Sequence, residues 1–203
     1  MPKPLKTCFV VFPGFPRACL TSRVEPLRAA NEISGTEAFG WRLSAETPGQ
    51  VTSSARVAFE ADTALAAVHH SDLLVLLSAP TAQFTHPGSA AHLRSLRRHG
   101  VSMGAVSGGV FPLVRAGVSG NKPVAVHWCY KAAFEADFPD HPSSDQVIEV
   151  TDRLLTAAGA AAGFDMSLHI IEHRLGKAIA AEVACWFQHP IMRREGVTQV
   201  VPS

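Results

Sequence analysis

The chain has 203 residues, of which 47% are hydrophobic and 17% charged. This length is typical of one globular domain, and the composition excludes a disordered chain. Its 18 basic and 17 acidic side chains leave a formal net charge of +1, which argues against a broad basic field for nucleic acid or an anionic membrane.

The four cysteines form no C-x-x-C pair and are typical of reduced thiols. The first apolar run is too short for a signal peptide, and no run of 18 apolar residues is present. We therefore expect a cytoplasmic protein without a membrane-spanning segment.

Short apolar runs alternate with amphipathic stretches along the chain. The pattern predicts strands over 7–12, 41–45, 72–77, 101–106 and 124–126, a hairpin of 147–150 with 154–157, and helices over 19–33, 64–68, 89–99, 108–116, 128–138, 161–175 and 178–187. Asp62-Thr63 is expected to cap the short helix over 64–68. Strands that alternate with crossover helices predict an α/β fold, with a mostly parallel sheet covered by helices on both faces.

In such folds, ligands bind beyond the carboxyl ends of the strands. The relevant positions are 13–16, 78–80, 107–109, 127–128 and 158–160. Among them, Ser107-Gly108-Gly109 turns from a predicted strand into a predicted helix with one small polar residue at the corner. This pattern is typical of a nucleophile elbow. An ordinary strand-to-helix turn that needs glycines is the alternative, and the position at a strand end favours a site.

The stretch Glu25-Pro-Leu-Arg-Ala-Ala-Asn31 and the pair His127-Trp128 carry a resemblance to a known group of proteins. They resemble the ThiJ/PfpI-like, class I glutamine amidotransferase-like, N-terminal sensor domains of AraC-family (GlxA-type) transcriptional regulators. Similar stretches occur in the same order at 9–14, 72–77, 104–109, 116–117, 155–159 and 164–169. The resemblance covers about residues 7 to 190.

This resemblance implies a flavodoxin-like three-layer αβα sandwich, a homodimer and a small-molecule effector, with no cofactor and no membrane partner. It divides the chain into an effector-binding domain over 1–190 and an exit arm over 191–203. The arm would lead to a helix-turn-helix domain outside this sequence, and DNA would be bound only through that domain. Relatives respond to nitrogenous metabolites such as amino acids and betaine-type amines.

Enzymes of the same superfamily carry a cysteine at the elbow and an acidic residue four positions before the helix proline. Here these positions hold Ser107 and Ser22, and a hydroxyl is a far weaker nucleophile than a thiolate. The loop after the central strand carries Pro80, which has no N–H to donate. We therefore expect a non-catalytic sensor in which Ser107 and His127 form a degenerate elbow. The alternatives are a hydrolase or hydratase that uses Ser107, and a dimerisation module with an empty pocket.

Within this resemblance, Glu25 is suited to accept an ammonium group and Arg28 to clamp a carboxylate. Trp128 offers a cation–π face for a quaternary amine. The alternative is that Glu25 and Arg28, three residues apart, pair with each other on a solvated helix face. The predicted ligand-binding set is Ser22, Glu25, Arg28, Asn31, Ala79, Ser107, Gly108, His127 and Trp128.

Three further patterns carry less weight. His169-Ile-Ile-Glu172-His173 spells a zinc-peptidase pattern, but it lacks a third ligand, and we expect no metal site. A serine-hydrolase triad could be completed after Ser107 only by choosing freely among Asp137, Asp145, His169 and His189. The basic cluster at 94–99 ends a predicted helix, where positive charge suits the helix dipole.

Overall fold

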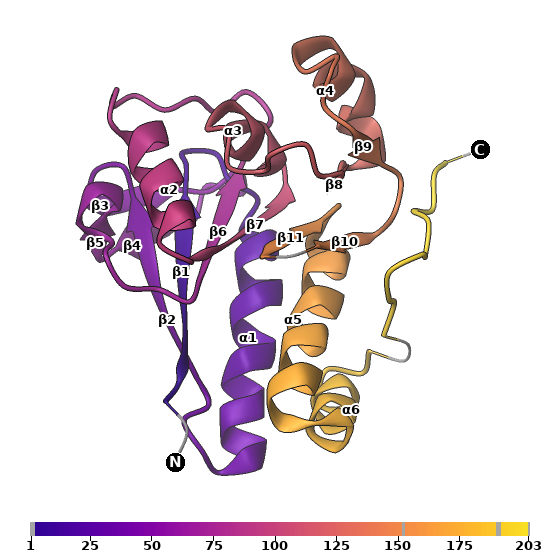
Figure 1. The fold of residues 1–203 in the computed structure, drawn as a ribbon. Helices are drawn as coiled ribbons and strands as arrows, with labels where there is room; N and C mark the ends of the chain where they lie inside the picture. The colour runs from indigo at the N-terminus through magenta and orange to yellow at the C-terminus, as the bar shows by residue number, and fades with distance from the viewer. Residues whose placement is uncertain (1–2, 152, 190–191, 203) are drawn as a thin grey trace.

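The computed structural model describes residues 3–151, 153–189 and 192–202. A seven-stranded sheet with the strand order β10-β11-β7-β6-β1-β2-β5 forms its centre (Figure 1). All neighbouring strands pair in parallel except β10, which runs antiparallel to β11. The strands are β1 (Leu5–Val11), β2 (Phe39–Ala45), β5 (Thr63–Ala64), β6 (Leu73–Ser78), β7 (Ser102–Ser107), β10 (Ile148–Thr151) and β11 (Leu154–Ala157). The predicted mostly parallel sheet and its terminal hairpin are confirmed.

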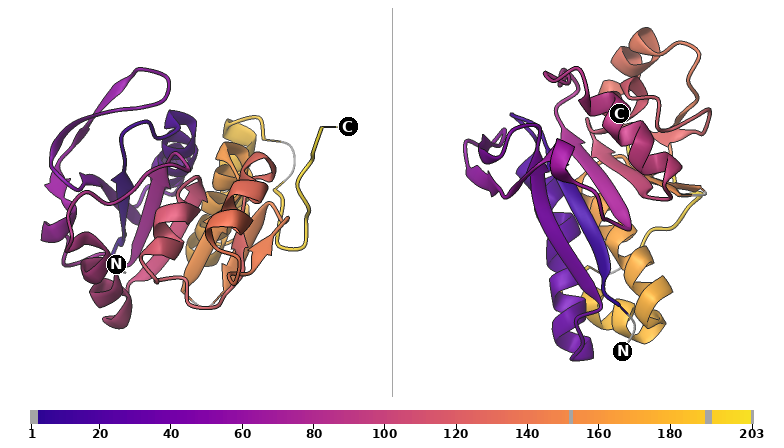
Figure 2. Two further views of the ribbon diagram at one scale, coloured as in Figure 1. Left: turned by 90° about the horizontal axis from the view of Figure 1, so that it is seen from above. Right: turned by 60° about the vertical axis from the view of Figure 1, so that its left-hand side comes forward.

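Helices cover both faces of this sheet (Figures 1 and 2). One layer contains α1 (Arg17–Ser34), α5 (Ala160–Leu175) and α6 (Lys177–Trp186), and the other contains α2 (Ser89–Arg98), α3 (Val110–Arg115) and α4 (Lys131–Asp137). Alternate residues of β1 divide between the two cores: Phe9 and Val11 pack with the first layer, and Cys8 and Val10 with the second. Because both faces are covered, the central strands are apolar throughout.

Local structure differs from the prediction in three places. The expected helix over 64–68 is a single 3-10 turn, η1 (Leu65–Ala67), whose N-cap is Ala64 without a side-chain cap. The expected cap at Asp62-Thr63 is therefore wrong, since Thr63 pairs with β2 as part of β5. The helix expected over 128–138 begins with a 3-10 turn, η2 (Trp128–Tyr130), before α4.

Two small two-stranded sheets complete the fold. β3 (Gly49–Thr52) pairs with β4 (Ala58–Ala61), and β8 (Val124–Ala125) pairs with β9 (Ser143–Ser144). None of the helices among the described residues is long and apolar enough to cross a lipid bilayer. The carboxyl ends of β1, β6, β7 and β11 meet at one edge of the sheet, and this edge carries the candidate site.

Candidate functional site

The elbow at the end of β7 has the strained geometry that its sequence suggests. Ser107 has φ +56°, in the left-handed region that few non-glycine residues adopt. A Cβ atom on Gly108 would lie 2.4 Å from the carbonyl oxygen of Ser78, and one on Gly109 would lie 2.0 Å from that of Leu76. The turn therefore passes directly against the end of β6, which only glycine permits at these two positions.

Ser107 is buried, with 5% of its surface exposed. Its hydroxyl lies close enough to two side chains, those of Cys19 at the start of α1 and Tyr130 in η2, to affect their pKa. Burial raises the pKa of Cys19 to about 12, and the hydrogen bond with Ser107 offsets this only in part. Burial likewise raises the pKa of Tyr130. The groups around the Ser107 hydroxyl are therefore protonated near neutral pH.

His127 is directed toward Cys129. Its Nδ1 accepts a hydrogen bond from the backbone N–H of Cys129 at 3.3 Å and lies 3.0 Å from Cys129 Sγ. Burial lowers the pKa of His127, and the opposite edge of its ring faces Gly159. Among the hydrogen bonds of the described residues, none joins His127 to Ser107. The two side chains are thus not arranged as a nucleophile and its base.

Two cavities flank the beginning of α5, which follows Gly159 and has no side-chain cap. The first, here called the helix-side cavity, has a volume of about 400 Å³ and is lined by Ala18, Thr21, Ser22, Glu25, Ala160, Ala161, Phe164, Phe187 and His189. The second, here called the arm-side cavity, has a volume of about 220 Å³ and is lined by His127, Trp128, Val147, Ala158–Ala162, Arg193, Gln199 and Val200. Both cavities share the first turn of α5.

The structure brings part of the predicted ligand set to these cavities. Ser22 and Glu25 line the helix-side cavity, and His127 and Trp128 line the arm-side cavity. Ser107 and Gly108 form the elbow, and Gly108 packs directly against Ala79. The predicted set is therefore divided between two cavities and the turn.

Arg28 and Asn31 do not reach either cavity. Arg28 bridges Glu25 and Glu32 at 2.9 and 2.7 Å on the exposed face of α1. The Asn31 amide donates to the carbonyl of Phe39 and accepts from the N–H groups of Ala38 and Phe39. Since α1 runs away from the site at about 1.5 Å per residue, Asn31 lies further from the helix-side cavity than Glu25 does. Neither Arg28 nor Asn31 lines one of the two cavities, and their part in ligand binding stays a prediction.

Two aromatic side chains outside the predicted ligand-binding set, Phe164 and Phe187, line the helix-side cavity. Phe164 and Phe187 meet edge to face with ring centroids 5.2 Å apart, and Phe164 lies 4.7 Å from the ring of His189. In the sequence, Phe164 belongs to a stretch that carries the resemblance, and its position one turn after Ala160 is the signal that places it at this cavity. No comparable signal joined Phe187 to this set, because it comes from the end of α6.

Residues 192–202, here called the C-terminal arm, run along the domain and form one wall of the arm-side cavity (Figure 1). The Gln199 side chain accepts from the N–H of Trp128 at 2.9 Å and donates to the carbonyl of Val126 at 2.7 Å. The N–H of Val147 donates to the carbonyl of Val197 at 2.8 Å. The predicted boundary at 190–191 lies outside the described residues.

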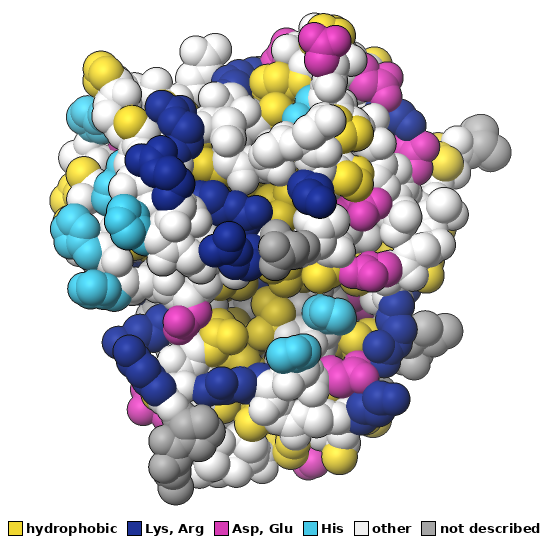
Figure 3. Space-filling model, in the orientation of Figure 1, with side chains coloured by type: hydrophobic (Ala, Val, Ile, Leu, Met, Phe, Trp, Pro, Cys, Tyr) yellow, Lys and Arg dark blue, Asp and Glu magenta, His cyan; other side chains and the backbone are white. Residues whose placement is uncertain are grey.

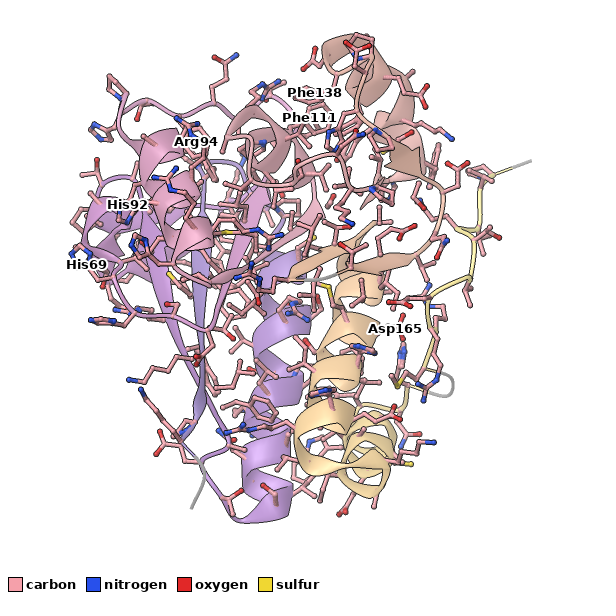
Figure 4. The ribbon with its side chains drawn as sticks, in the orientation of Figure 1. His69, His92, Arg94, Phe111, Phe138 and Asp165 are labelled. Atoms are coloured by element: carbon pink, nitrogen blue, oxygen red, sulfur yellow. The ribbon has the colours of Figure 1, made fainter. Side chains whose placement is uncertain are left out.

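A buried carboxylate fixes the beginning of the arm. Asp165 of α5 is fully buried and receives hydrogen bonds from His189 Nε2 at 2.7 Å and from Arg193 (Figure 4). Among the described residues, no group of three or more His, Cys, Asp or Glu side chains is placed to hold a metal ion.

The chain is similar over most of its length to curated HTH-type transcriptional regulators. It is 29% identical to the HTH-type transcriptional regulator CdhR of Pseudomonas aeruginosa over 178 residues, which cover 87% of this chain and 52% of that protein. It is 29% identical to GbdR of the same species over 195 residues, covering 96% and 53%. It is 28% identical to GlxA of Rhizobium meliloti over 198 residues, covering 94% and 60%. The chain thus spans about half of the length of these relatives. No protein-family model matches it.

Solved structures share the fold. An AraC family transcriptional regulator from Pseudomonas putida superposes with a TM-score of 0.81 at 22% identity, over 91% of this chain and all of that one. A ThiJ/PfpI family protein from Pseudomonas syringae gives 0.78 at 16% identity, over 96% and 78%. The chain has the ThiJ/PfpI-like fold. The same α/β architecture is found in Drosophila melanogaster DJ-1beta, with a TM-score of 0.72 at 22% identity over 90% of this chain and 97% of that one. The predicted similarity to AraC-family regulators is confirmed.

Proposed function

We propose that this chain is the non-catalytic, effector-binding domain of an AraC-family transcriptional regulator and that it binds a small nitrogenous metabolite beside the Ser107 elbow. The observation that carries the proposal is the similarity to HTH-type regulators, which extends over 87–96% of the chain. The longer protein would act in the cytoplasm and contact DNA through a separate helix-turn-helix domain. The resemblance also favours a homodimer, which light scattering of the purified chain would test.

The chemistry at the elbow supports a binding role over a catalytic one. Ser107 stands where the related enzymes carry a thiol, and Ser22 stands where they carry an acid. The hydroxyl faces two protonated groups, Cys19 and Tyr130. The one nearby imidazole, that of His127, is engaged with Cys129. A hydroxyl without an aligned base is suited to reversible hydrogen bonding.

The helix-side cavity fits a small zwitterion. Glu25 supplies a negative charge for an ammonium group, and the rings of Phe164 and Phe187 supply the aromatic faces that favour quaternary amines. The first N–H groups of α5 have no side-chain cap and can receive a carboxylate. An amino acid or betaine carries both charges on a small skeleton and so has a group for each of these partners. We place the effector in this cavity, with Ser22 at its wall.

Calorimetric titration with glycine betaine, choline and arginine would test this assignment. We expect at least one of these compounds to bind, to be recovered unchanged, and to bind at least tenfold more weakly to Glu25→Gln. The matched control is Glu32→Gln, because Arg28 bridges both carboxylates but only Glu25 lines the cavity. Equal weakening in both variants would contradict the placement in the cavity.

The strained backbone at Ser107 is the one observation that favours the enzymatic alternative. A hydrolase or hydratase that uses this hydroxyl should turn over simple esters or amides and should lose that turnover in Ser107→Ala. We expect no turnover from either protein. Turnover by the wild type that disappears in the variant would replace the sensor proposal with a catalytic one.

A further inference from the structure

A third cavity lies at the amino-terminal edge of the sheet, opposite the candidate site. It has a volume of about 570 Å³ and is lined by Leu5, Asp72, Leu73, Ser102, Val150, Thr151, Arg153, Leu155, His169, Ile170, His173 and Arg174. Its volume lies within the range typical of small-molecule sites. Strand β7 runs from Ser102 in this cavity to Ser107 at the elbow, so the two sites are about 17 Å apart. This cavity therefore does not belong to the proposed effector site.

The floor of this amino-edge cavity is apolar. Leu5 and Leu73 contribute from the beginnings of β1 and β6. The other floor residues are Val150 and Leu155 of the β10–β11 hairpin and Ile170 in the second half of α5. Figure 3 shows an apolar hollow on this face, bordered by Lys or Arg side chains above and below and by His side chains. One wall holds the hydroxyl of Thr151, which is buried and has no hydrogen-bond partner among the described residues. A buried unpaired hydroxyl indicates space for a water molecule or a ligand atom.

The rim of the cavity is cationic. The Arg153 guanidinium makes no hydrogen bond or ion pair with any other described residue, while Arg174 is held in place by donation to the carbonyl of Lys3. His169 and His173 stand one turn apart on α5 and likewise have no partner within the described part of the chain. Among the described lining residues, Asp72 supplies the one carboxylate, which accepts from the N–H of Lys6 at 2.7 Å. The rim thus presents donors to an anion.

His169 and His173, which belong to the zinc-peptidase pattern in the sequence, line this cavity. The Glu172 that stands between them in the sequence points away from the cavity and pairs with Arg194 at 2.8 Å. No third metal-ligating side chain joins them among the described residues. What remains is a pair of imidazoles over an apolar floor, next to the Arg153 guanidinium, which has no partner among the described residues.

We propose that the amino-edge cavity binds an amphipathic monocarboxylate, with its apolar body on the floor and its carboxylate between Arg153 and the two histidines. Guanidinium and imidazole groups are hydrogen-bond donors suited to a carboxylate. A polyanion without an apolar part would leave the floor exposed to water. A cation would be repelled by the positive charges of Arg153 and Arg174 at the rim. The site would take a chemically different ligand from the zwitterion proposed for the helix-side cavity.

Titration of the whole chain with sodium octanoate, compared with 1-octanol and octyltrimethylammonium, tests this assignment. We expect octanoate to bind at least tenfold more tightly than either comparison compound. It should also shift the ring NMR signals of His169 and His173 and leave that of His127 unchanged. Arg153→Gln should weaken octanoate binding at least fivefold, and Val150→Phe, which fills the floor, should do the same. The matched control is Arg98→Gln, an exposed arginine outside the lining, which should bind as the wild type does.

Three results would overturn the proposal. They are the absence of octanoate binding, equal binding of octanol, and a response of His127 without one at His169 and His173. The last of these would relocate the carboxylate to the opposite edge. Since glycine betaine and octanoate are assigned to different cavities, failure of either titration leaves the other assignment standing.

Discussion

Arg193 holds the buried carboxylate of Asp165 from two sides. Its backbone N–H donates to Oδ1 at 3.1 Å, and its side-chain Nε donates to Oδ2 at 2.7 Å. The two residues are 28 positions apart, and Asp165 is fully buried while Arg193 is partly exposed. This contact ties the C-terminal arm to α5 and places Arg193 in the wall of the arm-side cavity.

We expect Asp165→Asn to destabilise the domain by about 3 kcal/mol, because the variant leaves the Arg193 charge without its carboxylate. Chemical denaturation measures this loss, and hydrogen exchange should show faster opening at Gln199. Asp137→Asn is the control, since Asp137 pairs with Arg115 at the surface and such pairs contribute at most about 1 kcal/mol. Equal losses in the two variants would mean that the buried Asp165–Arg193 contact stabilises the domain no more than the surface ion pair does.

The close packing at the elbow predicts that alanine destabilises the domain at Gly109 but not at Gly40. Gly109→Ala should cost roughly 3 kcal/mol or more, because its Cβ would lie 2.0 Å from a backbone oxygen that cannot move aside. Gly40→Ala in β2 meets nothing within 4 Å and should be neutral or stabilising by up to about 1 kcal/mol. Thermal unfolding of both variants provides the comparison. A tolerated alanine at position 109 would mean that the turn can shift away from β6.

The Glu46 carboxylate at the end of β2 fastens the loop before α2. It accepts hydrogen bonds from the N–H and hydroxyl of Thr85 at 2.7 and 2.8 Å, from the N–H of His86, and from the Ser89 hydroxyl. Burial alone would raise the pKa of Glu46, but these hydrogen bonds outweigh it and hold the pKa below its ordinary value. Glu46→Gln should therefore cost roughly 2 kcal/mol at neutral pH.

The pH dependence of this contribution has a definite sign. Because the folded pKa of Glu46 lies below the unfolded one, the stabilisation is fully present above the ordinary carboxyl pKa, near 4.5. It is lost as the pH falls through the folded value. Denaturation at pH 7 and pH 3.5 should show the gap between wild type and Glu46→Gln closing in acid. The exposed Glu60→Gln should show no gap at either pH.

Arg23 is a cation buried between α1 and α5 without a carboxylate. Its Nη1 donates to Ser167 Oγ at 2.8 Å and to the carbonyl of Gly163 at 3.3 Å, while Nε and Nη2 have no partner within the described structure. Burial lowers the pKa of its guanidinium. Arg23→Met keeps most of the volume and should be neutral or stabilising, whereas Arg23→Ala should cost about 2–4 kcal/mol through the cavity it leaves. A large loss in the methionine variant would point to a bound anion or ordered water at this position.

The sequence predicts the main sheet and its helices because their signals are strong and local. Apolar strands such as 72–77 and helical spacing on 19–33 depend on neighbouring residues. The β3–β4 hairpin was missed because its strands are short and carry polar side chains such as Gln50 and Glu60. The alternation of Val57, Phe59 and Ala61 spans only five residues and is interrupted by the apolar Ala58.

The candidate site was predicted only in part, for a geometric reason. Ser22 and Glu25 line a cavity because they lie near the start of α1, and their part in ligand binding stays a prediction. Asn31 lies on the same helix, but its amide is taken up by the turn at Phe39, which a spacing argument cannot detect. The role of Gln199 depends on a return of the chain over more than seventy residues to Trp128, and no local pattern encodes that contact.

The contact between Asp165 and the arm also bears on where this domain can be cut or joined. A version shortened at residue 190, the boundary suggested by the resemblance, would keep His189 but lose Arg193 and Gln199. It would leave a buried carboxylate half-paired and open the wall of the arm-side cavity. A fusion or a graft that uses this domain as a ligand-responsive module should therefore keep the chain through Gln199. The useful junction lies after the arm. A displacement of Trp128 would reach a linker attached there through the hydrogen bond between Trp128 and Gln199.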